Sequence, residues 1–363
     1  MGHRALVAGH FMMFSLSAFG QHSSNTAIFT PTKNTASEIC SGKERFFEVP
    51  SPDRKAVILG TQFSYQAVGV DLSFVDRQLD LFKEANRLLV KKMDVPSAVS
   101  FILCPLHSGP ERRDDRLEQH LMLVERLKGI NDKIGSQDDA LTINLHEYGH
   151  AVFDVNARKC SKAWLDRRLL DEELGKLFDQ VKDLEMECQM PSANQNQCKT
   201  QLIKIENKIE EIKDKQGNDR LWLGTLAHEE LFADMLAAFT RKDPEAVSKG
   251  LDPFTGKGGL SEFEVSCRSC INTASIDQLK DCDFDHYRIS APVRALAWRA
   301  YESAAQKGED RRAEILMSLV NASCQMIESI AKKPSFDGYT AKTFNEEFLG
   351  ILTKDSLFHG ANP

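Results

Sequence analysis

The segment TINLHEYGHAVF, residues 142–153, constrains this chain most, because it places two imidazoles and a carboxylate on an otherwise apolar helix. His146 and His150 are four residues apart, so they lie one helical turn apart on the same face. The apolar residues around them predict that this helix is buried. Burying ionisable groups without a partner costs free energy, so the fold must supply a partner for these side chains. A metal ion is the simplest such partner.

The spacing within this segment is that of a hydrolytic metal site. Two His at i and i+4 can bind one ion, while Glu147 lies about 100° round the helix from His146, where it can reach water without binding the metal. A zinc ion lowers the pKa of its water to ~7, and a neighbouring carboxylate can accept the proton. We therefore expect His146 and His150 to bind Zn²⁺ and Glu147 to act as general base. Two surface His on an amphipathic helix are the alternative.

A zinc site needs a third protein ligand, and the best candidate lies in AHEELFAD, residues 227–234. Glu230 and Asp234 are again four residues apart on one helix face. His228 and Glu229 are rival ligands in the same segment, and a helix that is merely acidic is the remaining alternative.

Taken together, the two segments resemble the gluzincin branch of zinc metallopeptidases and, more distantly, the catalytic skeleton of thermolysin-like enzymes. The resemblance implies a zincin-like fold of the α+β class that hydrolyses peptide bonds in a peptide or protein. It also implies that Glu230 is the third ligand and that Asp234 hydrogen-bonds a ligand His, expected to be His146. A carboxylate in that position fixes the tautomer of the imidazole and raises its basicity.

The segment DHYRISAPVRALAW, residues 285–298, extends the resemblance. Thermolysin-like enzymes have a similarly spaced His that donates to the oxyanion of the tetrahedral intermediate, which gives His286 or Tyr287 that role here. A loop His beside an Arg-containing helix start is the alternative. The resemblance covers roughly residues 57–300, and only its three short motifs are specific.

Periodicity and composition divide the chain into consecutive parts: a signal peptide at 1–20, a loose leader at 21–55, an α/β lobe with the His-Glu helix at 56–160, an inserted helical hairpin at 161–220, and a mainly helical C-terminal lobe at 221–363. The first part has a basic start, an apolar run and small residues before a cut after Gly20, so we expect a secreted or periplasmic protein. A frayed apolar N-terminus is the alternative.

Within the α/β lobe, short strands at 56–60 and 98–103 flank a helix over 73–93, the order of a strand–helix–strand unit. Apolar residues at helical spacing also predict a helix over 116–130. The C-terminal lobe is expected to include a helix over 312–333.

The hairpin is predicted from charged sequence with apolar residues at heptad-like spacing on both sides of a polar turn at 190–197. Cys188 and Cys198 flank the turn and are expected to form a disulfide. Two roles are possible for the hairpin: a solvent-exposed insertion without a function of its own, or a lid or docking surface for a protein.

The nine cysteines all follow residue 20, and an odd number in an oxidising compartment leaves at least one thiol free or intermolecular. Cys267 and Cys270 are expected to form disulfides, with Cys282 bonded to one of the pair. A second zinc site that includes Cys282 and His286 is the alternative.

The predicted function is a secreted zinc metallopeptidase. The net charge of -7, with basic and acidic residues alternating, argues against a nucleic-acid partner, and no apolar run reaches the ~20 residues of a membrane span. Two other functions are compatible with the sequence. One is a zinc-containing but catalytically silent protein that binds a partner through the hairpin. The other is a zinc hydrolase of a non-peptide amide or ester.

Overall fold

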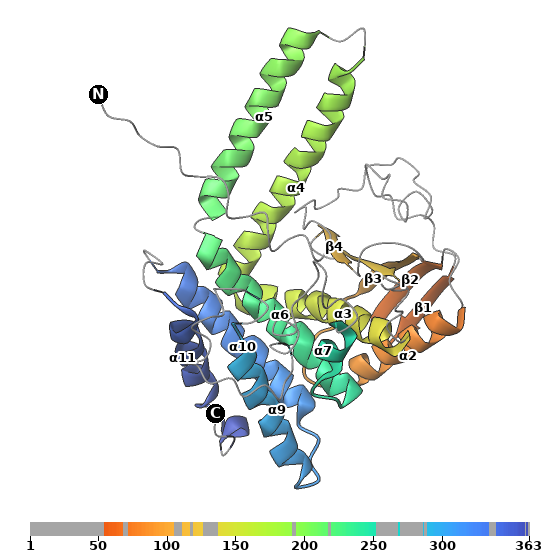
Figure 1. Cartoon of the computed structure of the whole chain (residues 1–363), viewed down its shortest axis with the longest axis vertical. Helices are drawn as coiled ribbons and strands as arrows, with labels where there is room; N and C mark the ends of the chain where they lie inside the picture. Colours follow the sequence, from red (N-terminus) through yellow and green to blue (C-terminus); the bar gives the residue numbers. More distant parts are fainter. Residues whose placement is uncertain are drawn as a thin grey trace.

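The body of the molecule consists of a five-stranded sheet and the helices that pack against it, and two long helices project from this body (Figure 1). The structure is a computed structural model. It describes residues 54–67, 72–104, 111–116, 119–125, 137–190, 194–216, 219–251, 268, 286, 289–333, 339–359 and 361. The predicted signal peptide and almost all of the leader lie outside these residues.

The elements follow one another in an order of the α+β class. They are β1 Arg54–Ile58, β2 Thr61–Ala67, α2 Leu72–Leu89, β3 Ala98–Cys104, β4 Glu111–Arg116, β5 Gln119–Glu125, α3 Gln137–Cys160, α4 Lys162–Cys188, α5 Gln195–Gln216, α6 Asp219–Arg241, α7 Ala246–Leu251, α9 Ala291–Ala305, α10 Arg312–Ala331, α11 Ala341–Leu352 and the 3-10 helix η3 Ser356–Phe358.

The sheet has the strand order β1-β2-β3-β5-β4. The β2–β3 and β3–β5 pairs are parallel, whereas the two edge pairs are antiparallel. The predicted strands at 56–60 and 98–103 and the helix between them are present as β1, β3 and α2, but the strand that α2 connects to the parallel β3 is β2 and not β1. β2 itself was not predicted. It follows β1 through a two-residue turn at Leu59 and Gly60, both with positive φ, as a type I′ hairpin turn requires.

The predicted helix over 116–130 is wrong. The chain instead forms β4 up to Arg116 and β5 over Gln119–Glu125. β5 lies between β3 and β4 and is hydrogen-bonded on both sides. Such pairing outweighs an apparent helical periodicity in a short apolar run, which periodicity alone cannot assign.

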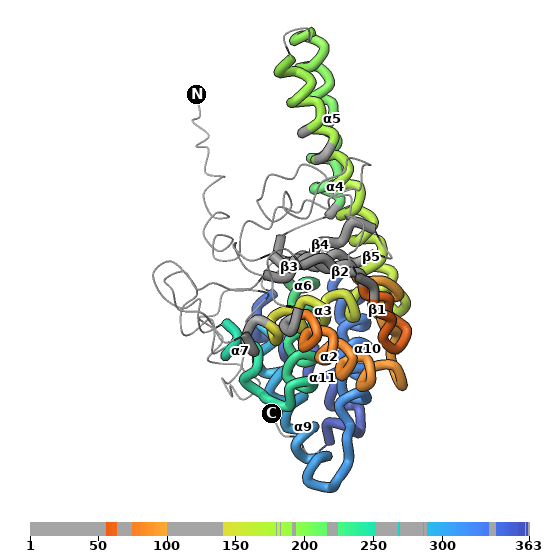
Figure 2. Tube along the Cα trace, turned by 90° about the vertical axis from the view of Figure 1, so that its right-hand side faces the viewer, coloured from red at the N-terminus to blue at the C-terminus, as the bar shows by residue number. Residues whose placement is uncertain are grey.

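Helix α3 contacts strands β4 and β5 of the sheet and packs against helices α6 and α10. It also packs against α2, which lies beside it in Figure 2. Its residues Leu145, Val152 and Phe153 are fully buried in the main hydrophobic core. A buried polar network also ties α3 to α2 and, through α2, to the sheet: the Tyr148 hydroxyl donates to Asn86 Oδ1 of α2 over 2.5 Å, and Asn86 Nδ2 donates to Thr61 Oγ1 of β2 at 3.1 Å. Burial raises the pKa of Tyr148 above its usual range, so this hydroxyl stays a donor.

Helices α4 and α5 form the predicted antiparallel hairpin, with a small core of their own: Leu174, Leu177, Ile209 and Ile212. The predicted disulfide between Cys188 and Cys198 is present near the tip. No helix in the described part of the chain is long and apolar enough to cross a membrane.

The base of the hairpin is fixed to the body at the junction of α3 and α4. A second disulfide, Cys160–Cys324, joins the end of α3 to α10. Ser161 caps α4 by accepting from the Trp164 amide, and Glu328 on α10 accepts from Ser161 Oγ at 3.0 Å. The start of α4 is thereby held against α10.

Candidate metal centre

The centre lies where helices α3 and α6 cross at close range. A Cβ atom added to Gly149 would lie 2.6 Å from the Cα of Ala233, a distance at which atoms overlap. Only glycine at position 149 therefore allows α6 this close. The crossing places the side chains of His146 and His150 opposite Glu230.

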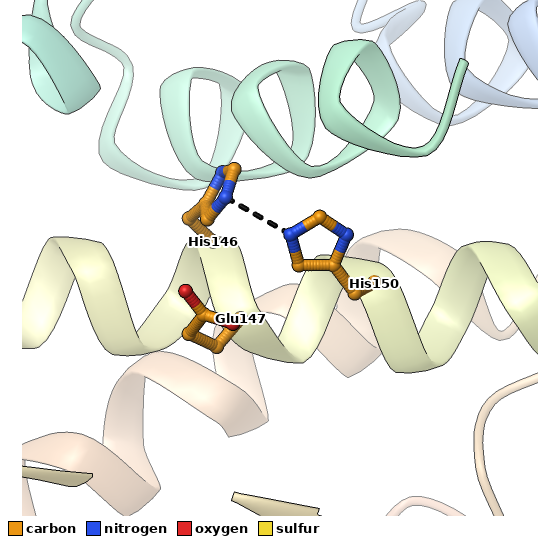
Figure 3. A group of neighbouring side chains, drawn as sticks. All are labelled: His146, Glu147 and His150. Carbon is orange, nitrogen blue, oxygen red and sulfur yellow. Dashed lines mark hydrogen bonds between the residues drawn. The ribbon is translucent and has the colours of Figure 1, made fainter. Parts of the chain in front are cut away.

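Donor atoms from these three side chains face one another. His146 Nε2 lies 3.1 Å from His150 Nε2 and 3.3 Å from Glu230 Oε2, and His150 Nε2 lies 3.5 Å from Glu230 Oε1. Figure 3 shows the two imidazoles pointing toward each other above α3. A tetrahedral site with bonds of about 2.0–2.1 Å has edges of about 3.3–3.4 Å. The three separations are close to this edge length, with Glu230 facing the two imidazoles through both of its carboxylate oxygens.

Glu147 completes a His-Glu-His group on α3 that can hold a metal ion. One atom from each of its three side chains lies within 4.8 Å of the others. Unlike the two imidazoles, the Glu147 side chain is only half-buried. It therefore has access to solvent at the edge of the site.

A carboxylate faces the second nitrogen of each imidazole. His146 Nδ1 lies 2.9 Å from Asp234 Oδ1, the partner that the sequence predicted. His150 Nδ1 lies 3.4 Å from Glu229 Oε1. Glu229, considered in the sequence as a rival ligand, thus faces the far side of His150. Its position one residue before Glu230, about 100° round the helix, is the signal that could have assigned it this place.

Two arginines, neither of them predicted, also reach Asp234. Arg268 donates through Nη2 to Asp234 Oδ1 at 2.7 Å and to Glu230 Oε2 at 3.1 Å. Arg294, at the start of α9, lies 2.8 Å from Asp234 Oδ2 through its own Nη2. Asp234 is fully buried, and these cations stabilise its charge.

The electrostatics of the centre follow from these contacts. Burial and Arg268 lower the pKa of His146, but hydrogen bonds to Asp234 and Glu230 outweigh them and raise it to about 9. Burial would raise the pKa of Glu230, yet the imidazoles of His150 and His146 hold it well below its usual range. Burial would also raise the pKa of Asp234, but Arg268 and Arg294 keep it low. Both carboxylates are therefore anionic.

The other candidate residues from the sequence either lie away from the three proposed ligands or fall outside the described residues. His228 is fully buried against Phe344 and Phe348 of α11, with ring centroids 5.1 and 4.8 Å away, so it is not a ligand. His286 lies half-buried in a turn. Tyr287 is outside the described residues, as are Cys267, Cys270 and Cys282. The oxyanion role and the pairing of these cysteines stay predictions.

Comparison with known proteins adds no relative: no protein-family model, no curated protein and no solved structure matches the chain. The chemistry of the centre therefore has to be argued from its own atoms.

Proposed function

We propose that this chain is a zinc metallopeptidase of the gluzincin type with a zincin-like catalytic fold, in which His146, His150 and Glu230 bind Zn²⁺. One observation carries the proposal: the donor atoms of three side chains from two helices approach one another to 3.1–3.5 Å. Two imidazoles and one carboxylate are a donor set of catalytic zinc sites, which keep a fourth position open. When bound, zinc supplies a Lewis acid that polarises a carbonyl and promotes ionisation of water.

The residues around the donors have distinct roles in this proposal. Glu147 accepts the proton of the attacking water and then passes it to the leaving amine, which its half-buried position allows. Asp234 accepts from the outer nitrogen of His146, so that the inner nitrogen carries the lone pair, and the Glu229 carboxylate faces the outer nitrogen of His150 from 3.4 Å. His286 and Tyr287 are the proposed donors to the oxyanion.

The substrate of the proposal is a peptide or protein outside the cytoplasm. Structural disulfides form and persist mainly in oxidising compartments, and the described part of the chain contains two. They support the predicted export of the protein. A role for the hairpin in docking a substrate stays part of the prediction.

The test is cleavage of a peptide library by the zinc-loaded protein, beside Glu147→Gln and a chelator-treated sample. Glu147→Gln should retain zinc but lose about 10²–10⁴-fold in rate, because the base is gone and the ligands are not. Glu346→Gln, an exposed residue of α11, is the matched control and should cleave normally.

A folded protein that binds one zinc but cleaves no peptide would contradict the peptidase proposal. The same samples would then be assayed on small amides and esters. Inactivity there as well would leave the silent binding protein as the remaining function, to be tested by deleting the α4–α5 hairpin and measuring partner binding.

A further inference from the structure

We propose that Arg268 tunes the metal centre by lowering its affinity for a divalent cation. This inference rests on the metal site of the proposed function, but not on peptidase activity. Arg268 was not among the residues that the sequence assigned to the site, and its side chain is buried at the centre of it.

The guanidinium of Arg268 contacts two of the atoms that would bind the proposed ion. Its Nη2 lies 3.1 Å from Glu230 Oε2 and 3.2 Å from His146 Nε2, which are both proposed ligand atoms. A hydrogen bond to Glu230 withdraws electron density from the oxygen that would donate to the metal. The same contact orients this carboxylate toward α3.

Arg268 does not block the coordination position itself. Its Nη2 is 3.4 Å from His146 Nδ1, nearly the same distance as from Nε2. An atom on the in-plane lone-pair axis of Nε2 would lie much farther from Nδ1, because a carbon separates the two nitrogens. The guanidinium therefore lies over the face of the imidazole, and the lone pair remains available to an ion.

The ion and the guanidinium would nevertheless be close neighbours of like charge. Both would contact the same two atoms inside a site from which most water is excluded, where charges are poorly screened. Arg294 already contacts the opposite oxygen of Asp234 from α9, so this carboxylate keeps a cationic partner when Arg268 is replaced. The net effect of Arg268 on a divalent cation is therefore repulsion.

The experiment measures the Kd for Zn²⁺ and for Co²⁺ by competition with a chromophoric chelator at one fixed pH. Arg268→Met removes the charge and keeps most of the apolar stem, and Arg268→Lys keeps the charge without the planar fork. We expect Arg268→Met to bind both ions about tenfold more tightly than the wild type, a change of the size that neighbours of metal ligands produce. Arg268→Lys should stay nearer the wild type.

Arg312→Met is the matched control, because Arg312 is also largely buried but contacts Asp310 and the Phe239 carbonyl instead of the centre. Its metal Kd should equal that of the wild type. Circular dichroism and the Co²⁺ absorption spectrum report whether each variant is folded and binds in the same geometry. If Arg268→Met does not fold, Arg268→Lys and Arg268→Gln are compared in the same way, and the neutral variant should bind more tightly.

A Kd that is unchanged or weaker in the neutral variant would overturn the tuning role. A wild-type protein that binds neither ion would overturn this inference together with the metal site. If the wild type binds zinc but cleaves nothing, only the peptidase proposal fails, because the affinity comparison does not depend on turnover.

Discussion

Gly149 on α3 lies against the backbone of Ala233 on α6 so closely that a Cβ at position 149 would be 2.6 Å from the Ala233 Cα. Gly149→Ala should therefore push the helices apart and destabilise the fold by about 1–3 kcal/mol, although alanine is the better helix former. The proposed donors would separate, and the zinc Kd should rise at least about tenfold. Urea denaturation and a zinc titration measure the two effects.

Gly350→Ala is the control for this prediction. Gly350 also lies within a helix, α11, but a Cβ there meets nothing within 4 Å. This variant should be neutral or more stable by about 0.5–1 kcal/mol and should bind zinc normally. Equal behaviour of the two alanine variants would show that the helices do not cross as closely as described.

Asp234→Asn should weaken zinc binding about 10–100-fold. The charged acceptor 2.9 Å from His146 Nδ1 is lost, so the imidazole is a poorer donor and its tautomer is less well fixed. Glu229→Gln should have a smaller effect, because its oxygen lies 3.4 Å from His150 Nδ1. Chelator competition ranks the two variants, and a larger effect of Glu229→Gln would reverse the order of importance assigned here.

His228 should make the stability of the protein depend on pH. Burial lowers its pKa from 6.5 to about 3, so between these values the unfolded chain binds a proton that the folded chain does not. The free energy of unfolding must therefore fall as the pH drops below 6.5, by roughly 2 kcal/mol at pH 5.

The measurement compares denaturant unfolding at pH 7 and pH 5 for the wild type and His228→Leu. The variant should lose less stability than the wild type over this interval. His359→Gln, at an exposed position, is the control and should keep the wild-type slope. An unchanged slope in His228→Leu would show that this imidazole titrates normally.

The two disulfides should differ in their contribution to stability. Cys160–Cys324 joins residues 164 positions apart, whereas Cys188–Cys198 closes a segment of 10. In the chain-entropy model a disulfide stabilises the fold by lowering the entropy of the unfolded chain. The expected stabilisation is about 5 kcal/mol for Cys160–Cys324 and about 3 kcal/mol for Cys188–Cys198. Paired Cys→Ala variants, compared by thermal unfolding, should show the larger loss for Cys160–Cys324. A larger loss for the hairpin disulfide would contradict the model.

Local spacing was sufficient to predict much of this molecule. The i, i+4 pairs identified the two helix faces that meet at the centre, and helical periodicity predicted the hairpin and α10. Such patterns depend only on residues within a few turns of each other. The same reasoning was wrong for β5, where the partner strands decide the structure and cannot be read from the strand itself.

Long-range charge partners were the main omission at the site. Arg268 follows Asp234 by 34 positions, and the sequence around it shows no helical or strand periodicity, so nothing local indicates that it contacts Glu230. Arg294 sits in a helix start whose sequence shows no acidic neighbour. The Cys160–Cys324 pairing was also missed, because connectivity cannot be deduced from cysteine positions alone.

The α4–α5 hairpin has a consequence for how fast the protein folds. Glu230 follows His150 by 80 positions, a separation that would make their encounter a slow, high-contact-order event in a featureless chain. We expect the hairpin to form first, starting at its tip, because its core residues, such as Leu177 and Ile209, are closer in sequence than His150 and Glu230. Each helical turn added to the hairpin shortens the length of unfolded chain that still separates α3 from α6. Lengthening both of its arms equally should therefore leave the rate at which the two helices meet almost unchanged.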